Sequence, residues 1–206
     1  LRVLNSLAGY IGAHREGFIV ADVGAGTGKL TENLIETGLT GRAVEPNDAM
    51  REEGMRLTGN DRFIWKKGSG ELTGLPDHSA DWVLMASSFH WTDQPKAIAE
   101  FHRILKPGGF FTALWNPRDL ERSELHMRIE RIVYAVAPEI TRVSSGSDKY
   151  TVGIEKVLTT GGLFGKPIFM EAPHELLMTK ERYLGAWRSV NDIQAAQMHF
   201  PVASVQ

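Results

Sequence analysis

The chain contains the stretch Phe18-Ile-Val-Ala-Asp-Val-Gly-Ala-Gly-Thr-Gly-Lys29, in which an apolar run leads into three glycines at alternate positions. Residues 18–23 predict a buried parallel strand, and residues 29–36 predict a helix. Glycine accepts positive φ angles and lets a ligand approach main-chain amides without an intervening Cβ. The helix that follows also presents free amide donors at its first turn. We therefore expect an α/β sheet that holds a nucleotide-like ligand at this turn.

The glycine spacing bears on the kind of ligand. Dinucleotide oxidoreductases use G-x-G-x-x-G, whereas this chain has G-x-G-x-G, with Lys29 where the third glycine of that pattern would stand. An NAD(P)-binding oxidoreductase is therefore a disfavoured alternative. A strand-to-helix turn without any ligand is the structural alternative.

An acidic residue follows the second predicted strand. Residues 39–44 predict a short strand, and Glu45 closes it just before Pro46. In doubly wound sheets a carboxylate about 20 residues past the glycine loop accepts hydrogen bonds from ribose hydroxyls. The alternative is a solvated loop glutamate. Both NAD and S-adenosylmethionine enzymes would use such a carboxylate, so Glu45 does not separate them.

Two later segments complete a predicted sheet. Residues 80–86 form an apolar run suited to a central strand buried on both faces, and residues 94–105 have helical periodicity. Lys106-Pro-Gly-Gly109 predicts the end of that helix, and residues 110–115 predict a fifth strand. The residues after position 86 are therefore expected at the carboxyl edge of the sheet, where open α/β folds bind ligands.

Three segments carry a family resemblance, and they are Ala21-Asp-Val-Gly-Ala-Gly-Thr-Gly28, residues 67–93 and Glu100-Phe-His-Arg-Ile-Leu-Lys-Pro-Gly-Gly109. In order and spacing they resemble the class I S-adenosylmethionine-dependent methyltransferases. More narrowly, they are similar to the type 11 group that includes trans-aconitate methyltransferase-like proteins. The resemblance spans residues 20–115 and extends more loosely to residue 188. It implies a three-layer, doubly wound, mostly parallel Rossmann-like sheet.

The resemblance also implies S-adenosylmethionine as cofactor and S-adenosylhomocysteine as product. The main chain at Gly24–Gly26 would pass under the methionine part, Glu45 would bind the ribose, and Ser69 would lie at the adenine edge. The family often has an acidic residue where Ser69 stands, whereas a serine accepts a hydrogen bond without carrying a charge. The full set that the resemblance assigns to the cofactor is Asp22, Gly24, Ala25, Gly26, Glu45, Pro46, Met50, Ser69, Gly70 and Ser87.

The residues just past the fourth strand are candidates for contact with the methyl acceptor. His90, Trp91, Trp115 and Asn116 are expected to line its pocket. A neutral His90 could accept a proton from a hydroxyl or carboxylic acid, although local packing is the structural alternative. A carboxylate acceptor would need no base, because the sulfonium is already activated and in-line placement supplies the rate. We expect Asp93 to cap the following helix.

Composition limits the classes of function. The 206 residues are 42% hydrophobic and 23% charged, which suffices for a full α/β core. There is no cysteine, the histidines form no metal motif, and the net charge of −2 argues against nucleic acid as substrate. No apolar run approaches the ~20 residues of a membrane span. We expect a cytoplasmic enzyme acting on a small molecule, and the sequence leaves the acceptor and the oligomeric state open. A methyltransferase-like protein that binds without turnover is a further alternative.

The remaining sequence predicts one domain over residues 1–206, with a core at 18–116 and a helical, lid-containing part at 117–206. Both ends look truncated, with residues 1–11 resembling the rear of an amphipathic helix. Further helices are expected at 122–137, 152–158 and 179–190, with a loop over the active site at 141–151. Residues 167–171 predict a sixth strand.

Overall fold

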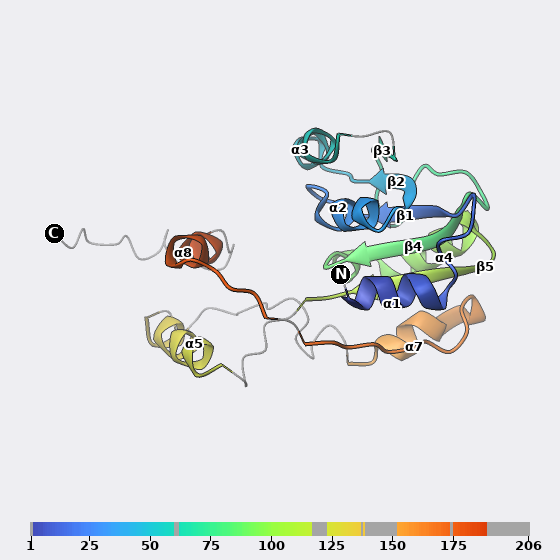
Figure 1. Ribbon diagram of the computed structural model, residues 1–206. Helices are drawn as coiled ribbons and strands as arrows, with labels where there is room; N and C mark the ends of the chain where they lie inside the picture. Colours follow the sequence, from blue (N-terminus) through green and yellow to red (C-terminus); the bar gives the residue numbers. More distant parts are fainter. Residues whose placement is uncertain are drawn as a thin grey trace. The chain divides into compact units, whose positions relative to one another are not determined.

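The computed structural model describes residues 2–59, 62–116, 123–136, 138, 152–173 and 175–188 (Figure 1). Contacts between residues divide the chain into two compact units. The first consists of Leu1–Asn116 and Asp148–Ala172, and the second of Pro117–Ser147 and Pro173–Gln206. That residues 1–206 act as one domain stays a prediction.

The first unit is built on a five-stranded sheet in which every paired strand is parallel, in the order β3-β2-β1-β4-β5. The strands are β1 Ile19–Val23, β2 Thr40–Val44, β3 Phe63–Lys66, β4 Ala80–Ala86 and β5 Leu105–Leu114. The chain runs outward from β1 to β3 and then returns to place β4 on the other side of β1. The point where the direction of winding reverses therefore lies between β1 and β4, and such a point is where open α/β sheets bind ligands.

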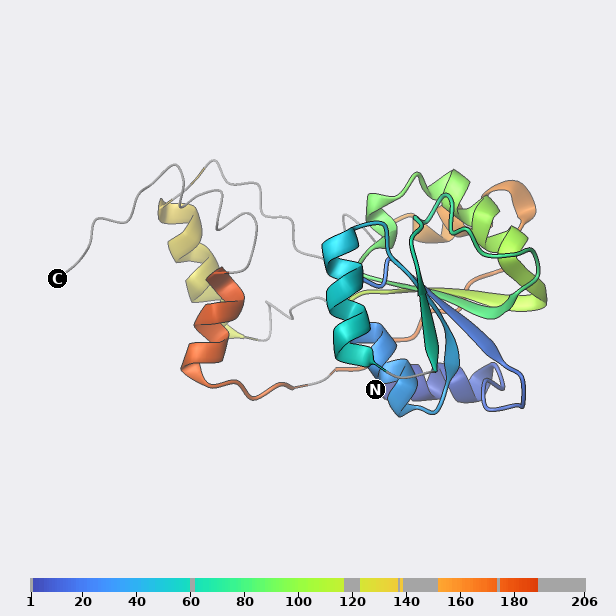
Figure 2. The same ribbon diagram turned by 90° about the horizontal axis from the view of Figure 1, so that it is seen from above.

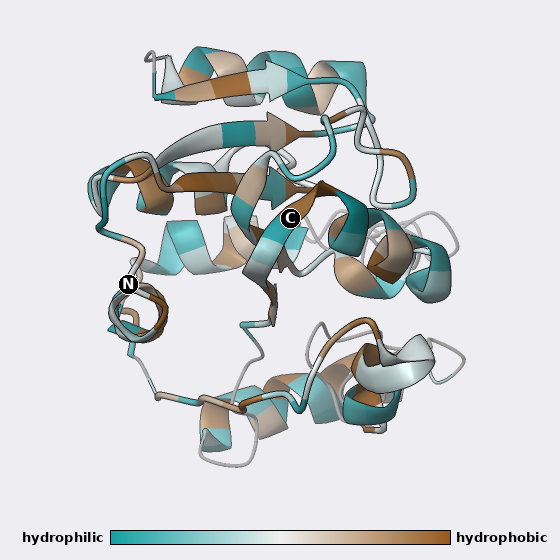
Figure 3. Ribbon diagram, turned by 90° about the vertical axis from the view of Figure 1, so that its right-hand side faces the viewer, coloured by the Kyte–Doolittle hydropathy of each residue, from teal (hydrophilic) through white to brown (hydrophobic). Residues whose placement is uncertain are grey.

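Helices cover both faces of this sheet, which gives three layers (Figure 2). On one face, apolar side chains of α1 Arg2–Tyr10 and α2 Lys29–Glu36 pack with those of β1 and β4, and α3 Asp48–Thr58 contacts α2 and β3. On the other face, α4 Gln94–Ile104 and α7 Ile154–Thr159 share a second apolar cluster. Hydrophobic stretches run along the strands in Figure 3, as expected for a sheet buried on both sides.

The predicted fold class is confirmed, and α2 and β4 have the predicted bounds. The fifth strand starts earlier than predicted, because Ala80 pairs with Leu105 while Trp82 pairs with Phe110. Residues 106–109 therefore form a bulge inside β5 and not a loop before it. Among the α-helices and strands, α3 and the short edge strand β3 were not predicted.

The predicted sixth strand at residues 167–171 is wrong. This segment has no strand structure, and Ile168 and Phe169 are 62% and 64% exposed. A strand needs a neighbour to satisfy its amides and carbonyls, and β5 pairs only with β4 among the described residues. The predicted helix at 152–158 is confirmed as α7, which continues into the 3₁₀ turn η2 Thr160–Gly162. The predicted loop at 141–151 lies outside the described residues.

The second unit contains α5 Glu124–Val136 and α8 Lys180–Arg188, which confirm the predicted helices at 122–137 and 179–190. His126 of α5 stacks on Tyr183 of α8 with ring centroids 6.1 Å apart. Neither helix has a fully buried residue. Within the described ranges, none of the helices combines the length and apolar character that crossing a membrane requires.

Candidate functional site

The loop after β1 folds back against the end of β2. The amides of Gly24 and Ala25 both donate to the carbonyl of Val44, at 2.8 and 3.1 Å. Gly24 has a φ of +68°, and a Cβ there would lie 2.8 Å from Ser88 Oγ. Gly26 has a φ of +57°, and its Cβ would meet Met50 Cε at 3.3 Å. Side chains at these two positions would be strained and would fill the space beside the loop.

Glu45 closes β2 and is held by main-chain amides on both sides. Its Oε2 accepts from the amide of Gly26 and its Oε1 from the amide of Asn47, each at 2.9 Å, and the residue is only 6% exposed. A carboxylate can accept about four hydrogen bonds, so each oxygen keeps a further lone pair. The arrangement fixes an acceptor beside the glycine loop that can bind two neighbouring hydroxyl groups.

Asp22, near the end of β1, is buried and incompletely hydrogen-bonded. Its Oδ2 accepts from the Thr31 hydroxyl at 2.6 Å, while its Oδ1 has no hydrogen-bond partner among the described residues. Burial raises the pKa of this carboxyl to about 7, with Glu45 adding to the shift and Thr31 opposing it. An unpartnered buried carboxylate oxygen suits a cation, so these residues fit a cofactor that carries an ammonium group.

The end of β4 is strained. Ser87 has a φ of +52°, which is unusual for a residue with a side chain, and its amide donates to the carbonyl of Leu114 at 2.8 Å. The following Ser88 directs its hydroxyl toward the carbonyl of Val23 at 3.4 Å. Left-handed backbone at a non-glycine residue costs about 1–3 kcal/mol and often marks a functional site. The two serines thus connect the end of β4 to the ends of β5 and β1.

The residues assigned to the adenine lie on two different loops. Pro46 is exposed and Met50 is 42% exposed, and Met50 lies beside Gly26. Ser69 starts a turn in which its amide donates to the carbonyl of Leu72 at 2.9 Å, and Gly70 is buried against Thr92. The predicted cofactor residues therefore all lie beyond or near the carboxyl ends of the strands.

The structure brings three of the four predicted pocket residues together. His90 and Trp91 belong to the 3₁₀ turn η1 Phe89–Trp91, with ring centroids 4.9 Å apart, and Trp115 Nε1 donates to His90 Nδ1 at 3.4 Å. Burial lowers the pKa of His90, which favours the neutral imidazole. Trp91 is 76% exposed, and Asn116 is exposed just after Trp115.

The structure confirms the predicted capping role of Asp93 and shows three residues near the site that the sequence did not indicate. Asp93 is the N-cap of α4, as predicted, and accepts from the amide of Lys96 at 3.4 Å. Asn47 was missed although it caps α3 and contacts Glu45, and a polar residue before a helical run could have revealed it. No local signal points to Thr31 or Ser88, because their partners depend on how the strands are arranged.

Metal coordination finds no support in the described part of the chain. No group of three or more histidine, aspartate or glutamate side chains there could hold an ion.

Comparisons with known proteins agree with this geometry. Residues 21–113 match the family model described as "Methyltransferase domain". An uncharacterized methyltransferase of Mycobacterium tuberculosis is 42% identical over 100 residues, which are 48% of this chain and 40% of that protein. An uncharacterized methyltransferase-like protein of Schizosaccharomyces pombe is 34% identical over 109 residues, which are 50% of this chain and 40% of that protein. The chain thus spans about two fifths of the length of these curated relatives.

Solved structures match over more of the chain. A protein described as a Type II methyltransferase of Anaeromyxobacter dehalogenans has a TM-score of 0.66 at 22% identity, over 96% of this chain and 81% of that one. A structure described as an S-adenosyl-L-methionine-dependent methyltransferase of Methanococcus maripaludis has a TM-score of 0.62 at 23% identity, over 82% and 78% of the two chains. At these identities the likeness establishes the fold.

Over residues 21–113 the chain is therefore similar to methyltransferase domains, and its fold is the Rossmann-like fold of solved methyltransferases.

Proposed function

We propose that this protein transfers a methyl group from S-adenosylmethionine to a small-molecule acceptor, through a carboxylate or hydroxyl oxygen, and releases S-adenosylhomocysteine. The observation that carries the proposal is the pair of buried carboxylates at the reversal point of the sheet. Glu45 is fixed by the amides of Gly26 and Asn47, and Asp22 keeps an unpartnered oxygen. One carboxylate suits ribose hydroxyls and the other suits an ammonium group.

The proposed cofactor site assigns a task to each part of the loop. Gly24, Ala25 and Gly26 leave room for the methionine part, since side chains at Gly24 and Gly26 would fill that space. Ser87 would offer its main-chain carbonyl to the ammonium group. Pro46 and Met50 would cover one side of the adenine, and Ser69 and Gly70 would border its edge. The cofactor supplies a methyl group already activated on a sulfonium.

The acceptor side is proposed to consist of His90, Trp91, Trp115 and Asn116. A neutral His90 would remove a proton from a hydroxyl acceptor through Nδ1, which requires that the acceptor hydroxyl replace the Trp115 indole N–H at this nitrogen. The two tryptophans would exclude water from the reacting atoms. A carboxylate acceptor would need only orientation, because it is already ionised at neutral pH. The narrower proposal is an activity of the trans-aconitate methyltransferase type, on a small carboxylic acid.

Two alternatives differ in a measurable way. An NAD(P)-binding oxidoreductase would also use Glu45 for the ribose, but it would bind NAD in preference to S-adenosylhomocysteine. A methyltransferase-like binding protein would bind S-adenosylhomocysteine without transferring a methyl group to any acceptor.

Calorimetric titration of the purified chain with S-adenosylhomocysteine, with NAD as control, tests the cofactor assignment first. We expect micromolar binding of S-adenosylhomocysteine and no binding of NAD. The reverse preference would contradict the proposal. Glu45→Ala should weaken binding by about 1–3 kcal/mol, because two charge-assisted hydrogen bonds are lost. Transfer of radiolabelled methyl groups to a panel of small carboxylic acids and alcohols then separates the enzyme from the non-catalytic alternative.

A further inference from the structure

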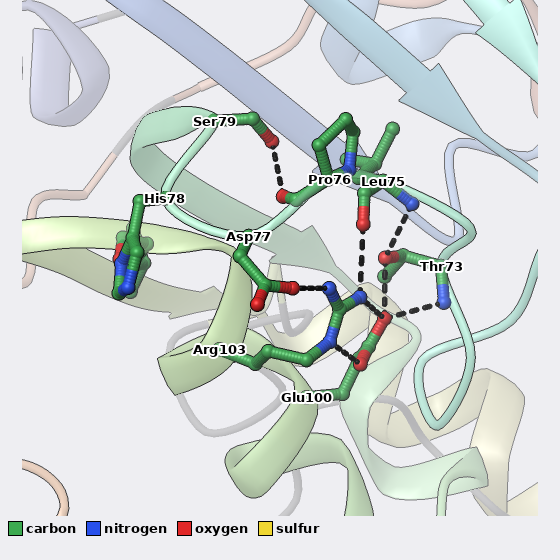
Figure 4. A network of polar contacts seen from close by, with 9 residues as sticks. Thr73, Leu75, Pro76, Asp77, His78, Ser79, Glu100 and Arg103 are labelled. Carbon is green, nitrogen blue, oxygen red and sulfur yellow. Dashed lines mark hydrogen bonds and ion pairs between the residues drawn. The ribbon is translucent and has the colours of Figure 1, made fainter.

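An ion pair on α4, between the buried Glu100 and the partly exposed Arg103, holds the connection between β3 and β4, outside the residues assigned to the cofactor (Figure 4). Glu100 and Arg103 lie one turn apart on this helix. The connection spans residues 67–79 and includes Ser69 and Gly70, which we assign to the adenine edge. The pair therefore acts on a segment that carries two proposed cofactor residues.

Glu100 fixes Thr73 through both the main chain and the side chain. Its Oε1 accepts from the amide of Thr73 at 2.9 Å and from the Thr73 hydroxyl at 2.5 Å. Burial alone would raise the pKa of Glu100, but Arg103 and Thr73 outweigh it and hold the pKa below its ordinary value. Glu100 is therefore ionised at neutral pH and bonds to Thr73 as a carboxylate.

Arg103 completes the anchor and extends it along the connection. Its Nε and Nη2 donate to the two oxygens of Glu100 at 2.8 and 2.7 Å. The same Nη2 donates to the carbonyl of Leu75 at 2.9 Å, and Nη1 bonds to Asp77. Two further main-chain bonds, from His78 to Arg103 and from Ser79 to Ile104, tie the end of the connection to α4.

The main chain of Thr73 packs closely against Gly68, the residue just before the turn that starts at Ser69. A Cβ on Gly68 would lie 2.5 Å from the carbonyl oxygen of Thr73 and 2.9 Å from Val44 Cγ1. Gly68 is therefore pressed between Thr73 and the residue that precedes Glu45. We therefore expect a displacement of Thr73 to shift Gly68, and with it the neighbouring Ser69, relative to the carboxylate proposed to bind the ribose.

The far side of the same turn is held by the loop that follows η1. Glu71 Oε1 accepts from the amide of Asp93 at 2.8 Å, and a Cβ on Gly70 would lie 2.7 Å from Thr92 Cγ2. With Thr73 fixed on one side and Asp93 on the other, the turn has little freedom to adjust to a ligand.

We propose that Glu100 and Arg103 are positioning residues for the adenine ring, acting through Thr73 on the Ser69–Gly70 turn. Neither residue is proposed to touch the cofactor. The inference rests on the proposed function, because it requires that the turn border an adenine.

The test compares two ligands that differ by the adenine, S-adenosylhomocysteine and S-ribosylhomocysteine. Glu100→Gln should lower the affinity for S-adenosylhomocysteine about tenfold, which is equivalent to one good hydrogen bond. The affinity for S-ribosylhomocysteine should change by less than about twofold. Thr73→Val replaces the hydroxyl by a methyl group and should give a smaller loss of S-adenosylhomocysteine affinity. Thr73→Ser keeps the hydroxyl and should show the wild-type ratio of the two affinities.

Asp81→Asn is the matched control, since the side chains of Asp81 and Glu100 are both 7% exposed and both bind cations. It should lower the free energy of unfolding without changing the ratio of affinities. Equal losses of both ligands in Glu100→Gln and Thr73→Val, or no loss in either variant, would overturn the inference while leaving the proposed function intact. Failure of the wild-type chain to bind S-adenosylhomocysteine would overturn both.

Discussion

Asp22 and Asp81 lie on the neighbouring strands β1 and β4, and they are 1% and 5% exposed. Asp81, at the amino end of the sheet, accepts from Arg15, from Lys106 and from the amide of Ile19 at 2.7–2.9 Å. Burial raises its pKa, but these partners outweigh burial and hold the pKa below its ordinary value. Asp22, at the carboxyl end, accepts from the Thr31 hydroxyl, and its other oxygen has no partner within the described ranges. Its pKa is raised to about 7 by burial.

The difference shows at which end of the sheet the chain's own groups satisfy the buried carboxyl. At the amino end, cations and amides of the chain satisfy the buried carboxylate. At the carboxyl end the buried carboxyl of Asp22 has one oxygen without a partner among the described residues, and the backbone is strained at Ser87. Stability alone does not favour such features, but they are common where a ligand supplies the missing interactions.

The largest effect expected from breaking this comparison is on cofactor binding. Gly26→Asp should weaken S-adenosylhomocysteine by about 100-fold or more, or about 2.7 kcal/mol, because the side chain occupies the proposed ligand space next to Glu45. Gly108→Asp is the matched control at the amino end, since Gly108 also has a positive φ of +77° but nothing within 4 Å of its Cβ. Calorimetry on both variants measures their affinities for S-adenosylhomocysteine. Equal affinities would contradict the assignment of the cofactor to the carboxyl end of the sheet.

An effect of similar size, on stability, is expected at the amino end. Asp81→Asn should lower the free energy of unfolding at pH 7 by about 2–4 kcal/mol, because Arg15 and Lys106 lose their shared anion. Urea denaturation measures this loss. A change of less than about 0.5 kcal/mol, the size of an ordinary surface substitution, would show that the amino end does not depend on this ion pair.

At the carboxyl end, replacing the buried aspartate by asparagine should raise the free energy of unfolding and not lower it. Because the pKa of Asp22 is raised from 3.8 to about 7 by folding, wild-type stability falls as the pH rises between these two values. Asp22→Asn, which cannot ionise, should therefore unfold less readily than wild type by about 1–3 kcal/mol above pH 7 and show no such advantage near pH 4. Thermal denaturation across this range checks the pattern. A destabilised variant at pH 8 would contradict the view that the buried charge is unsatisfied.

The smallest effect concerns His90. Burial lowers its pKa, so an NMR titration should place it below the ordinary value of 6.5. His90→Gln should remove that titration and leave S-adenosylhomocysteine affinity within about twofold, since His90 is assigned to the acceptor and not to the cofactor. A clear loss of cofactor affinity would instead give His90 a role in shaping the cofactor site.

The parts of the fold that sequence predicted well have strong local signals. The alternation of glycines after an apolar run located the turn after β1, and two buried runs located β1 and β4. The edge strand β3 has only four residues, and Phe63, Ile64 and Trp65 are all hydrophobic, so the sequence does not show the alternation in exposure that the strand has. Residues 167–171 look like a strand because they are apolar, but their sequence does not reveal whether a neighbouring strand is present to pair with them.

The sequence by itself determined the class of fold, the position of the glycine loop and the identity of Glu45 as the carboxylate beside it. These features depend on short-range patterns that any strand–turn–helix unit must show. Only the tertiary structure decided that Gly26 and Asn47 hold Glu45, that Thr31 leaves one oxygen of Asp22 unpartnered, and that Glu100 anchors the turn at Ser69 through Thr73. These contacts join residues on different elements, and they form only when parallel strands bring their carboxyl ends to one edge and pack α4 beneath them.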